Sequence, residues 1–240
     1  MTMLDVKHVT KSFGGVVANR DISFQCEEGA IIGLIGPNGA GKTTLFNCLT
    51  GAFAADEGSV VFCGKNINGM TPQRILREGI ARTFQITKTF RTMTVLENVM
   101  VGAFFHHRSV KHAQKAAMEI LEFTGLADRA GLLGSELTVA DRKRVEIART
   151  LATKPKMLML DEAMAGLNPT EVQQAVEMVR RIRDMGVTIM IVEHIMEVVL
   201  PLSDRILVMD QGQLIMQGTR DQVVNDERVI SAYLGVNRGA

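Results

Sequence analysis

The chain has 240 residues, and its 27 Lys and Arg residues against 26 Asp and Glu residues leave a formal net charge of +1. A chain of this length forms one globular domain with room for a subdomain. The near-neutral charge excludes an overall electrostatic field that would attract nucleic acid or anionic lipid. We therefore expect no nucleic-acid partner, and we expect any contact with a membrane to be local.

No segment has the length or the composition of a membrane span or a secretion signal. The longest apolar runs, residues 157–160 and 187–192, are far shorter than the roughly 20 residues that cross a bilayer. The N-terminal residues are polar and lack the apolar core of a signal peptide. The sequence therefore predicts no transmembrane segment, no signal peptide and a cytoplasmic location.

The number and spacing of the three cysteines indicate whether they are free, paired or metal-binding. Cys26, Cys48 and Cys63 are odd in number, have no CxxC spacing, and each lies in or beside an apolar segment. This pattern favours buried free thiols over disulfides or a metal site.

The N-terminal part of the chain passes from one predicted pattern to another. Residues 4–30 alternate between apolar and polar side chains around a break at residues 13–15, which predicts antiparallel strands. Residues 31–35 form a short apolar run, and residues 44–49 follow at helical spacing after a glycine-rich loop. The sequence therefore predicts a strand, a loop and a helix in succession.

The middle of the chain is predicted to be helical. Residues 87–151 have almost no strand signal, and segments 111–121 and 141–151 are strongly helical with charged residues on one side. We interpret this stretch as a helical subdomain.

The C-terminal part returns to an α/β pattern. Residues 157–160 and 187–192 are apolar runs of strand length, separated by the helical pattern of residues 170–184. Strands covered on both faces are typical of a parallel sheet built from βαβ units. Residues 206–216 predict a hairpin near the end of the chain.

A complete P-loop pattern, GxxxxGK[ST], lies between the predicted strand and helix. Its residues, together with the hydroxyl that follows, are Gly36, Pro37, Asn38, Gly39, Ala40, Gly41, Lys42, Thr43 and Thr44. The backbone N–H groups of such a loop and the N-terminus of its helix surround phosphate oxygens. We expect Lys42 to reach the β- and γ-phosphates of ATP, and the Thr43 hydroxyl to bind the Mg²⁺ ion that bridges them.

Two acidic residues end the apolar run of residues 157–160. Asp161 is placed to hold Mg²⁺ through its water shell, and Glu162 can polarise the attacking water. Taken alone, such a pair could merely cap a strand. Beside a complete P-loop, it predicts an ATP-hydrolysing site.

These elements, in this order, resemble the ATP-binding subunits of ABC transporters over nearly the whole chain. The resemblance implies one ABC ATPase domain of α/β class: a P-loop NTPase core with a mixed sheet, an N-terminal antiparallel β subdomain and an inserted α-helical subdomain. The core and the β subdomain are expected in residues 1–86 and 152–240. The helical subdomain, which carries the family's signature, is expected in about residues 87–151.

The resemblance also implies roles for single residues. Phe13 stands where the family has an aromatic side chain that stacks on adenine. Gln85 matches the glutamine that senses Mg²⁺ and the γ-phosphate, and His194 matches the histidine that hydrogen-bonds the γ-phosphate. Residues 166–168 look like the loop that touches the opposing subunit of a dimer.

Longer strings are similar to one branch of the family, the ATPases of branched-chain amino acid importers. They are residues 83–85 with 90–99, residues 163–169 and residues 231–235. Relatives in this branch import amides, urea or other organic acids, so the transported solute stays open.

The signature segment departs from the family pattern. Where the family has Leu-Ser-Gly-Gly-Gln, this chain has Leu137 followed by Thr138, Val139, Ala140 and Asp141. In related proteins this segment contacts the γ-phosphate of ATP held by the other subunit. Thr138 keeps a hydroxyl, whereas Asp141 places a carboxylate near phosphate, although it also suits a helix start. Two interpretations remain open: the segment is a tolerated variant with its backbone contacts intact, or it weakens the half of the ATP site that this chain lends to its partner.

The resemblance finally implies partners. These are transmembrane permease subunits, a second ABC ATPase subunit (a second copy or a relative) and, indirectly, a solute-binding protein, with this chain peripheral on the cytoplasmic face of the membrane. The apolar pair Phe104 and Phe105 either belongs to the subdomain core or receives a short helix of the permease.

Two other functions are possible for such a chain. A soluble ABC ATPase that remodels a protein or nucleic-acid assembly would share the same site residues. A small-molecule kinase would share the P-loop, but it has no use for Gln85, the signature and His194 in this order.

Overall fold

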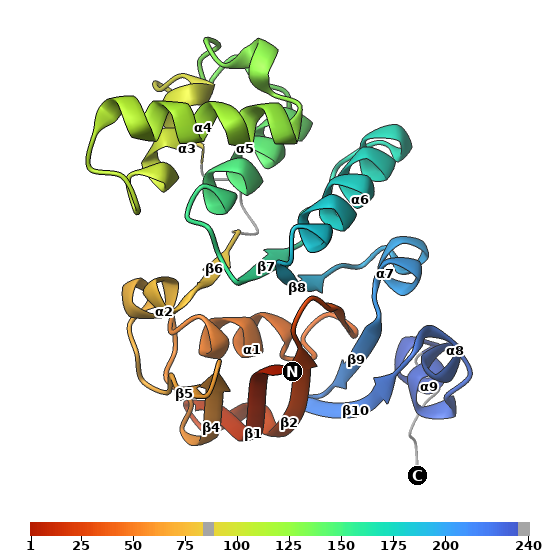
Figure 1. The fold of residues 1–240 in the computed structure, drawn as a ribbon. Helices are drawn as coiled ribbons and strands as arrows, with labels where there is room; N and C mark the ends of the chain where they lie inside the picture. The colour runs from red at the N-terminus through yellow and green to blue at the C-terminus, as the bar shows by residue number, and fades with distance from the viewer. Residues whose placement is uncertain (84–88, 235–240) are drawn as a thin grey trace.

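A computed structural model describes residues 1–83 and 89–234 of the chain. Two sheets and a separate group of helices make up the fold (Figure 1). The smaller sheet has the strand order β2-β1-β4-β5 and is antiparallel throughout. Its strands are β1 Thr2–Phe13, β2 Val16–Glu27, β4 Glu57–Phe62 and β5 Lys65–Asn66. The antiparallel strands predicted over residues 4–30 are therefore confirmed.

The larger sheet is mixed, with the order β10-β9-β3-β8-β7-β6. Its strands are β3 Ile31–Ile35, β6 Ile80–Arg82, β7 Met157–Asp161, β8 Thr188–Val192, β9 Arg205–Asp210 and β10 Gln213–Gly218. Every pair is parallel except β9 with β10, the predicted hairpin. All residues of β3, β7 and β8 are buried, because helices and the smaller sheet cover both faces.

The helices divide between the two faces of the larger sheet and a separate layer. They are α1 Lys42–Leu49, α2 Pro72–Glu78, α3 Val95–Ala103, α4 Val110–Thr124, α5 Val139–Leu151, α6 Pro169–Asp184, α7 Met196–Leu202, α8 Arg220–Val224 and α9 Glu227–Leu234, with a 3₁₀ turn at Ala127–Arg129. None of the described helices is long and apolar enough to span a bilayer.

Alternation along the strands sends side chains into two cores. Ile32 and Leu34 of β3 face a core that α1 and the smaller sheet share. Ile31 and Ile35 face the opposite core, which α6 and α7 cover. Helix α1, which follows the P-loop, is thus packed between the two sheets.

A third core joins α3, α4 and α5, which lie together above the sheets in Figure 1. Gly102 lets α3 approach α5 closely, because a Cβ atom there would lie 2.0 Å from the carbonyl oxygen of Arg149. The helices predicted at 111–121 and 141–151 are confirmed in α4 and α5.

The prediction for the cysteines is wrong in one place. Cys26 and Cys48 are buried, but Cys63 is exposed. Cys63 lies in the turn between β4 and β5 with φ of 48°, outside the apolar strand that precedes it.

Candidate nucleotide site

The P-loop curls tightly between β3 and α1. Gly41 stands directly before α1 with φ of 96°, a conformation that favours glycine. A Cβ atom on Gly41 would lie 2.4 Å from the carbonyl oxygen of Ala18, and one on Gly36 would lie 2.2 Å from that of Met209. The loop can therefore take this course only because glycine occupies these positions.

Lys42 lies inside the curve of the loop. Its side chain is buried, with the residue 6% exposed, and Nζ donates to the carbonyl oxygens of Gly36 at 2.6 Å and Pro37 at 2.9 Å. Burial lowers the pKa of the Lys42 ammonium, while the charges of Glu162 and Asp161 act in the opposite direction. The sequence-predicted lysine and both acids therefore lie close enough to interact electrostatically.

One cavity of about 550 Å³ joins these elements. It is lined by residues from five parts of the chain: Val16, Val17, Ala18, Asn38, Gly39, Ala40, Gly41, Lys42, Thr43, Thr44, Glu162, His194, Gln211 and Gly212. Residues of the P-loop, an acid and a histidine thus line the same space, although more than a hundred positions of sequence separate the P-loop from Glu162.

Glu162 and His194 meet at the carboxyl ends of neighbouring parallel strands. Asp161 of β7 pairs in register with Val192 of β8, so the residues that follow both strands emerge side by side. Oε1 of Glu162 lies 2.7 Å from Nε2 of His194. Glu162 has φ of 51°, a left-handed conformation that is rare for a residue with a side chain.

Asp161 ends β7 with its side chain buried, the residue being 2% exposed. Nη2 of Arg82, from the end of β6, donates to Oδ2 of Asp161 at 2.9 Å, and Nη1 donates to Asn47 and Thr50 of the α1 region. Burial raises the pKa of Asp161, and the Arg82 guanidinium opposes this. Arg82 was not singled out from the sequence, because only the parallel pairing of β6 with β7 brings it to Asp161.

The donor atoms near the P-loop suit a hard cation. Thr43 supplies a hydroxyl and Asp161 a carboxylate, and oxygen donors of this kind, completed by phosphate and water, are those Mg²⁺ prefers. In residues 1–83 and 89–234, no cluster of three or more His, Cys, Asp and Glu side chains could hold a metal. A Mg²⁺ ion here would take its remaining ligands from phosphate and water.

Comparison with known proteins now identifies the family. The family model described as "ABC transporter" matches residues 19–165, which is more than half of the chain. The chain belongs to the ABC transporter family of ATP-binding cassettes. A second model, "Branched-chain amino acid ATP-binding cassette transporter", matches residues 213–238.

Similar proteins support the assignment over the whole length. The chain is 40% identical to the high-affinity branched-chain amino acid transport ATP-binding protein LivG of Escherichia coli K12, covering 97% of this chain and 98% of LivG. It is 37% identical to BraF of Pseudomonas aeruginosa PAO1, a protein with the same description, covering 97% and 98%. The predicted family and the predicted similarity to its branched-chain amino acid branch are thereby confirmed.

Solved structures confirm the predicted fold. A nucleotide-free ATP-binding cassette from an ABC transporter aligns with a TM-score of 0.89 at 34% identity, covering 97% of this chain and 99% of that one. A cassette in its ADP conformation aligns with a TM-score of 0.90 at 34% identity, covering 98% and 99%.

Phe13, which was predicted to stack on adenine, is not among the residues that line this cavity. Phe13 is 43% exposed and packs edge-on against Phe53, with ring centroids 5.1 Å apart. Val16, and not Phe13, is among the residues that line the cavity. Gln85 lies outside the described residues.

The signature segment of the cassette begins α5. Thr138 is the N-cap of this helix, and its Oγ1 accepts from the backbone N–H of Asp141 at 3.1 Å and donates to Oδ2 of Asp141 at 2.8 Å. Arg129 forms an ion pair with Oδ1 of the same carboxylate. Val139 is 53% exposed, and Ala140 is buried.

The turn between β9 and β10 is a part of the site that the sequence did not reveal. The N–H of Gly212 donates to the carbonyl oxygen of Ala40 at 3.1 Å, which places Gln211 at the edge of the cavity. The sequence predicted this hairpin, but only the pairing of β9 with β3 brings it to the P-loop.

Proposed function

We propose that this cassette binds and hydrolyses ATP to drive an importer for branched-chain amino acids or a related small organic solute. The observation that carries the ATPase is the meeting of Lys42, Glu162 and His194 at one cavity. The cargo class rests on the near-full-length similarity to LivG and BraF and on the C-terminal match.

Binding of ATP would begin with its phosphates in the P-loop. Nζ of Lys42 now donates to two P-loop carbonyl oxygens, and β- and γ-phosphate oxygens are stronger, charged acceptors for the same ammonium. The N-terminus of α1 adds a favourable dipole. Thr43, Asp161 and the glutamine at position 85 would hold Mg²⁺, which neutralises phosphate charge when bound.

Hydrolysis would be carried out by the pair at the end of β7 and β8. Glu162 would accept a proton from the attacking water and so act as the general base. His194, whose Nε2 lies 2.7 Å from Glu162, orients the carboxylate and can hydrogen-bond the γ-phosphate. Phe13 or its neighbour Val16 would then contact the adenine ring.

A second ATPase subunit, identical or related, would complete each site. Thr138 to Asp141 would face the γ-phosphate on the partner, with α5 directing its N-terminus there. Residues 166–168 would touch the partner in the same interface. Residues 87–151 would move as a helical subdomain during closure.

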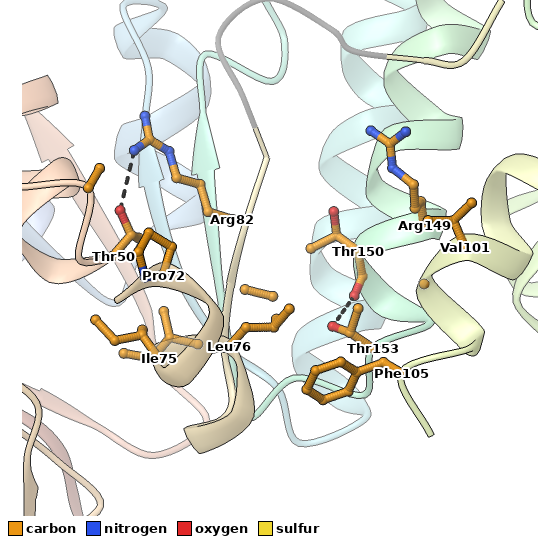
Figure 2. A pocket seen from close by; sticks show the side chains of 14 residues that line it. Thr50, Pro72, Ile75, Leu76, Arg82, Val101, Phe105, Arg149, Thr150 and Thr153 are labelled. Atoms are coloured by element: carbon orange, nitrogen blue, oxygen red, sulfur yellow. Dashed lines mark hydrogen bonds between the residues drawn. The ribbon is translucent and has the colours of Figure 1, made fainter. Parts of the chain in front are cut away.

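The contact with a permease is proposed at an apolar pocket of about 460 Å³ (Figure 2). Pro72, Ile75 and Leu76 line one side, and Val101 and Phe105 of the α3 region line the other. A short apolar helix of a transmembrane permease subunit fits such a groove. This contact would hold the chain peripherally at the cytoplasmic face of the membrane, with a solute-binding protein acting on the far side.

The test is to purify the chain with the membrane proteins that accompany it and to reconstitute them in vesicles. We expect ATP-dependent uptake of leucine, isoleucine or valine, and ATPase activity that a cargo-loaded binding protein stimulates. Uptake of a different organic solute would correct the cargo alone. Association with a soluble protein or nucleic-acid assembly, with no membrane chain, would refute the transport function.

A further inference from the structure

The turn that carries Glu162 needs support from outside itself. Its left-handed backbone, with φ of 51°, is a conformation that side-chain-bearing residues rarely adopt. The N–H of Glu162 donates to the carbonyl oxygen of Val192 at 2.9 Å, and the N–H of Ala165 donates to the Glu162 carbonyl at a longer 3.2 Å. Hydrogen bonds from outside the turn therefore help to fix the backbone from which the Glu162 side chain extends, and His194 contacts the carboxylate itself.

Lys143 holds one side of the turn. This residue lies in the second turn of α5, and its Nζ donates to the carbonyl oxygen of Glu162 at 2.9 Å. A hydrogen bond from an ammonium group is stronger than one between neutral groups. Burial lowers the pKa of the Lys143 ammonium, while the charges of Glu193, Glu146 and Glu162 act in the opposite direction.

Glu193 holds the other side of the turn. It lies between β8 and His194, is 2% exposed, and its Oε1 accepts from the N–H of Met164 at 2.7 Å. Met164 is itself fully buried. Burial raises the pKa of Glu193, whereas the hydrogen bond from the Met164 N–H and the charge of Lys143 act in the opposite direction and so favour the carboxylate form.

We propose that Lys143 and Glu193 form a charged clamp that fixes the turn at residues 162–164, and that Lys143 is a positioning residue for hydrolysis. The clamp connects two sites, because α5 carries the signature that serves the partner's ATP, whereas Glu162 serves the ATP bound to this chain. A movement of α5 when the two ATPase subunits dock would thus shift the turn that carries Glu162, through the hydrogen bond from Lys143. This inference rests on the proposed ATPase function.

Three variants of the full-length chain test the clamp. In K143M, loss of the ammonium should lower kcat at least about tenfold, since a charge-assisted hydrogen bond is lost, while the Kd for ATP stays within about twofold. K143R keeps a charged donor and should retain most of the activity. K111M, which removes an exposed lysine of α4, is the matched control and should behave like wild type.

A second readout does not depend on activity. Amide hydrogen exchange of the peptide spanning residues 160–166 should become at least about tenfold faster in K143M and unchanged in K143R and K111M. If K143M does not fold, K143Q, whose shorter neutral side chain cannot replace the ammonium, is measured instead with the same expectation.

The possible results distinguish a failure of the clamp proposal from a failure of the proposed ATPase function. Wild-type kcat and unchanged exchange in K143M would overturn the clamp while leaving the ATPase intact. An inactive wild-type chain would refute the proposed function, and the exchange of residues 160–166 would still decide whether Lys143 holds the turn. Equal losses of kcat in K143M and K143R would also overturn the proposal, because the charge would then not be the cause.

Discussion

Arg129 and Asp141 form an ion pair at the start of α5, in the segment where this cassette departs from the family signature. Thr138 donates to the second oxygen of the same carboxylate at 2.8 Å. The acidic side chain that would repel a partner's phosphate is therefore balanced by a cation and engaged in a helix cap. This arrangement favours the tolerated variant over the weakened half-site.

Removal of the Arg129 guanidinium should lower ATPase activity, because the Asp141 carboxylate is then no longer balanced by a positive charge. In R129M we expect ATPase activity of the assembled transporter to fall about fivefold, equivalent to roughly 1 kcal/mol for a partly exposed ion pair. The added change D141N should recover most of the loss, because the uncompensated charge is gone. Equal rates in wild type and R129M would show that the pair has no such role.

Restoring the two glycines of the family signature should not raise the ATPase rate of the cassette. Val139 is already exposed and backbone donors remain at the helix start, so the double change Val139→Gly with Ala140→Gly gains no phosphate contact. We expect an unchanged or lower rate, with stability reduced by about 1–2 kcal/mol from two glycines in the helix. A faster assembled transporter would instead establish a weakened half-site.

Loss of the P-loop ammonium should abolish nucleotide binding. Lys42→Ala removes the only side-chain cation that the P-loop itself provides, and we expect the Kd for ATP to rise by a factor of about a hundred, or roughly 3 kcal/mol. Equilibrium binding of a fluorescent ATP analogue measures this. K111A, at an exposed position of α4, is the control and should bind normally, whereas equal binding by both variants would contradict the role of Lys42.

Arg82 should set the metal requirement of the site. Because its guanidinium fixes one oxygen of the buried Asp161, Arg82→Met should raise the Mg²⁺ concentration for half-maximal ATPase activity about tenfold. Arg82→Lys should have an intermediate effect, since it keeps the charge but loses the fork-shaped geometry. Titration of ATPase activity with Mg²⁺ tests this, and identical titrations for all three proteins would refute it.

The apolar pocket should govern assembly and not basal activity. Phe105→Asp places a charge in the proposed permease contact, and we expect co-purification of the membrane chains to fall at least tenfold, in line with about 2 kcal/mol for a buried unpaired charge. Val110→Asp, also exposed but outside the pocket, is the control. Normal assembly of the Phe105 variant would place the permease contact elsewhere.

The sequence predicts those parts of the site that lie within one motif or directly after a strand, and it does not predict contacts between side chains of separate elements. The P-loop is contiguous, Glu162 directly follows one buried strand, and His194 comes two residues after the next strand in the sheet, so their approach to one edge of the sheet was predictable. The pairs Arg82 with Asp161, and Lys143 with the Glu162 carbonyl, join residues from separate elements. Their side-chain directions depend on strand order and helix packing, which no local pattern specifies.

The proposed hydrolysis depends most directly on Glu162, the residue that would polarise the attacking water. The variant Glu162→Gln keeps the shape of the side chain and removes the base, so it should bind ATP with a Kd within about twofold of wild type while kcat falls at least about a hundredfold. Single-turnover hydrolysis of bound ATP, measured beside equilibrium binding, gives both numbers. Normal turnover by Glu162→Gln would contradict the mechanism.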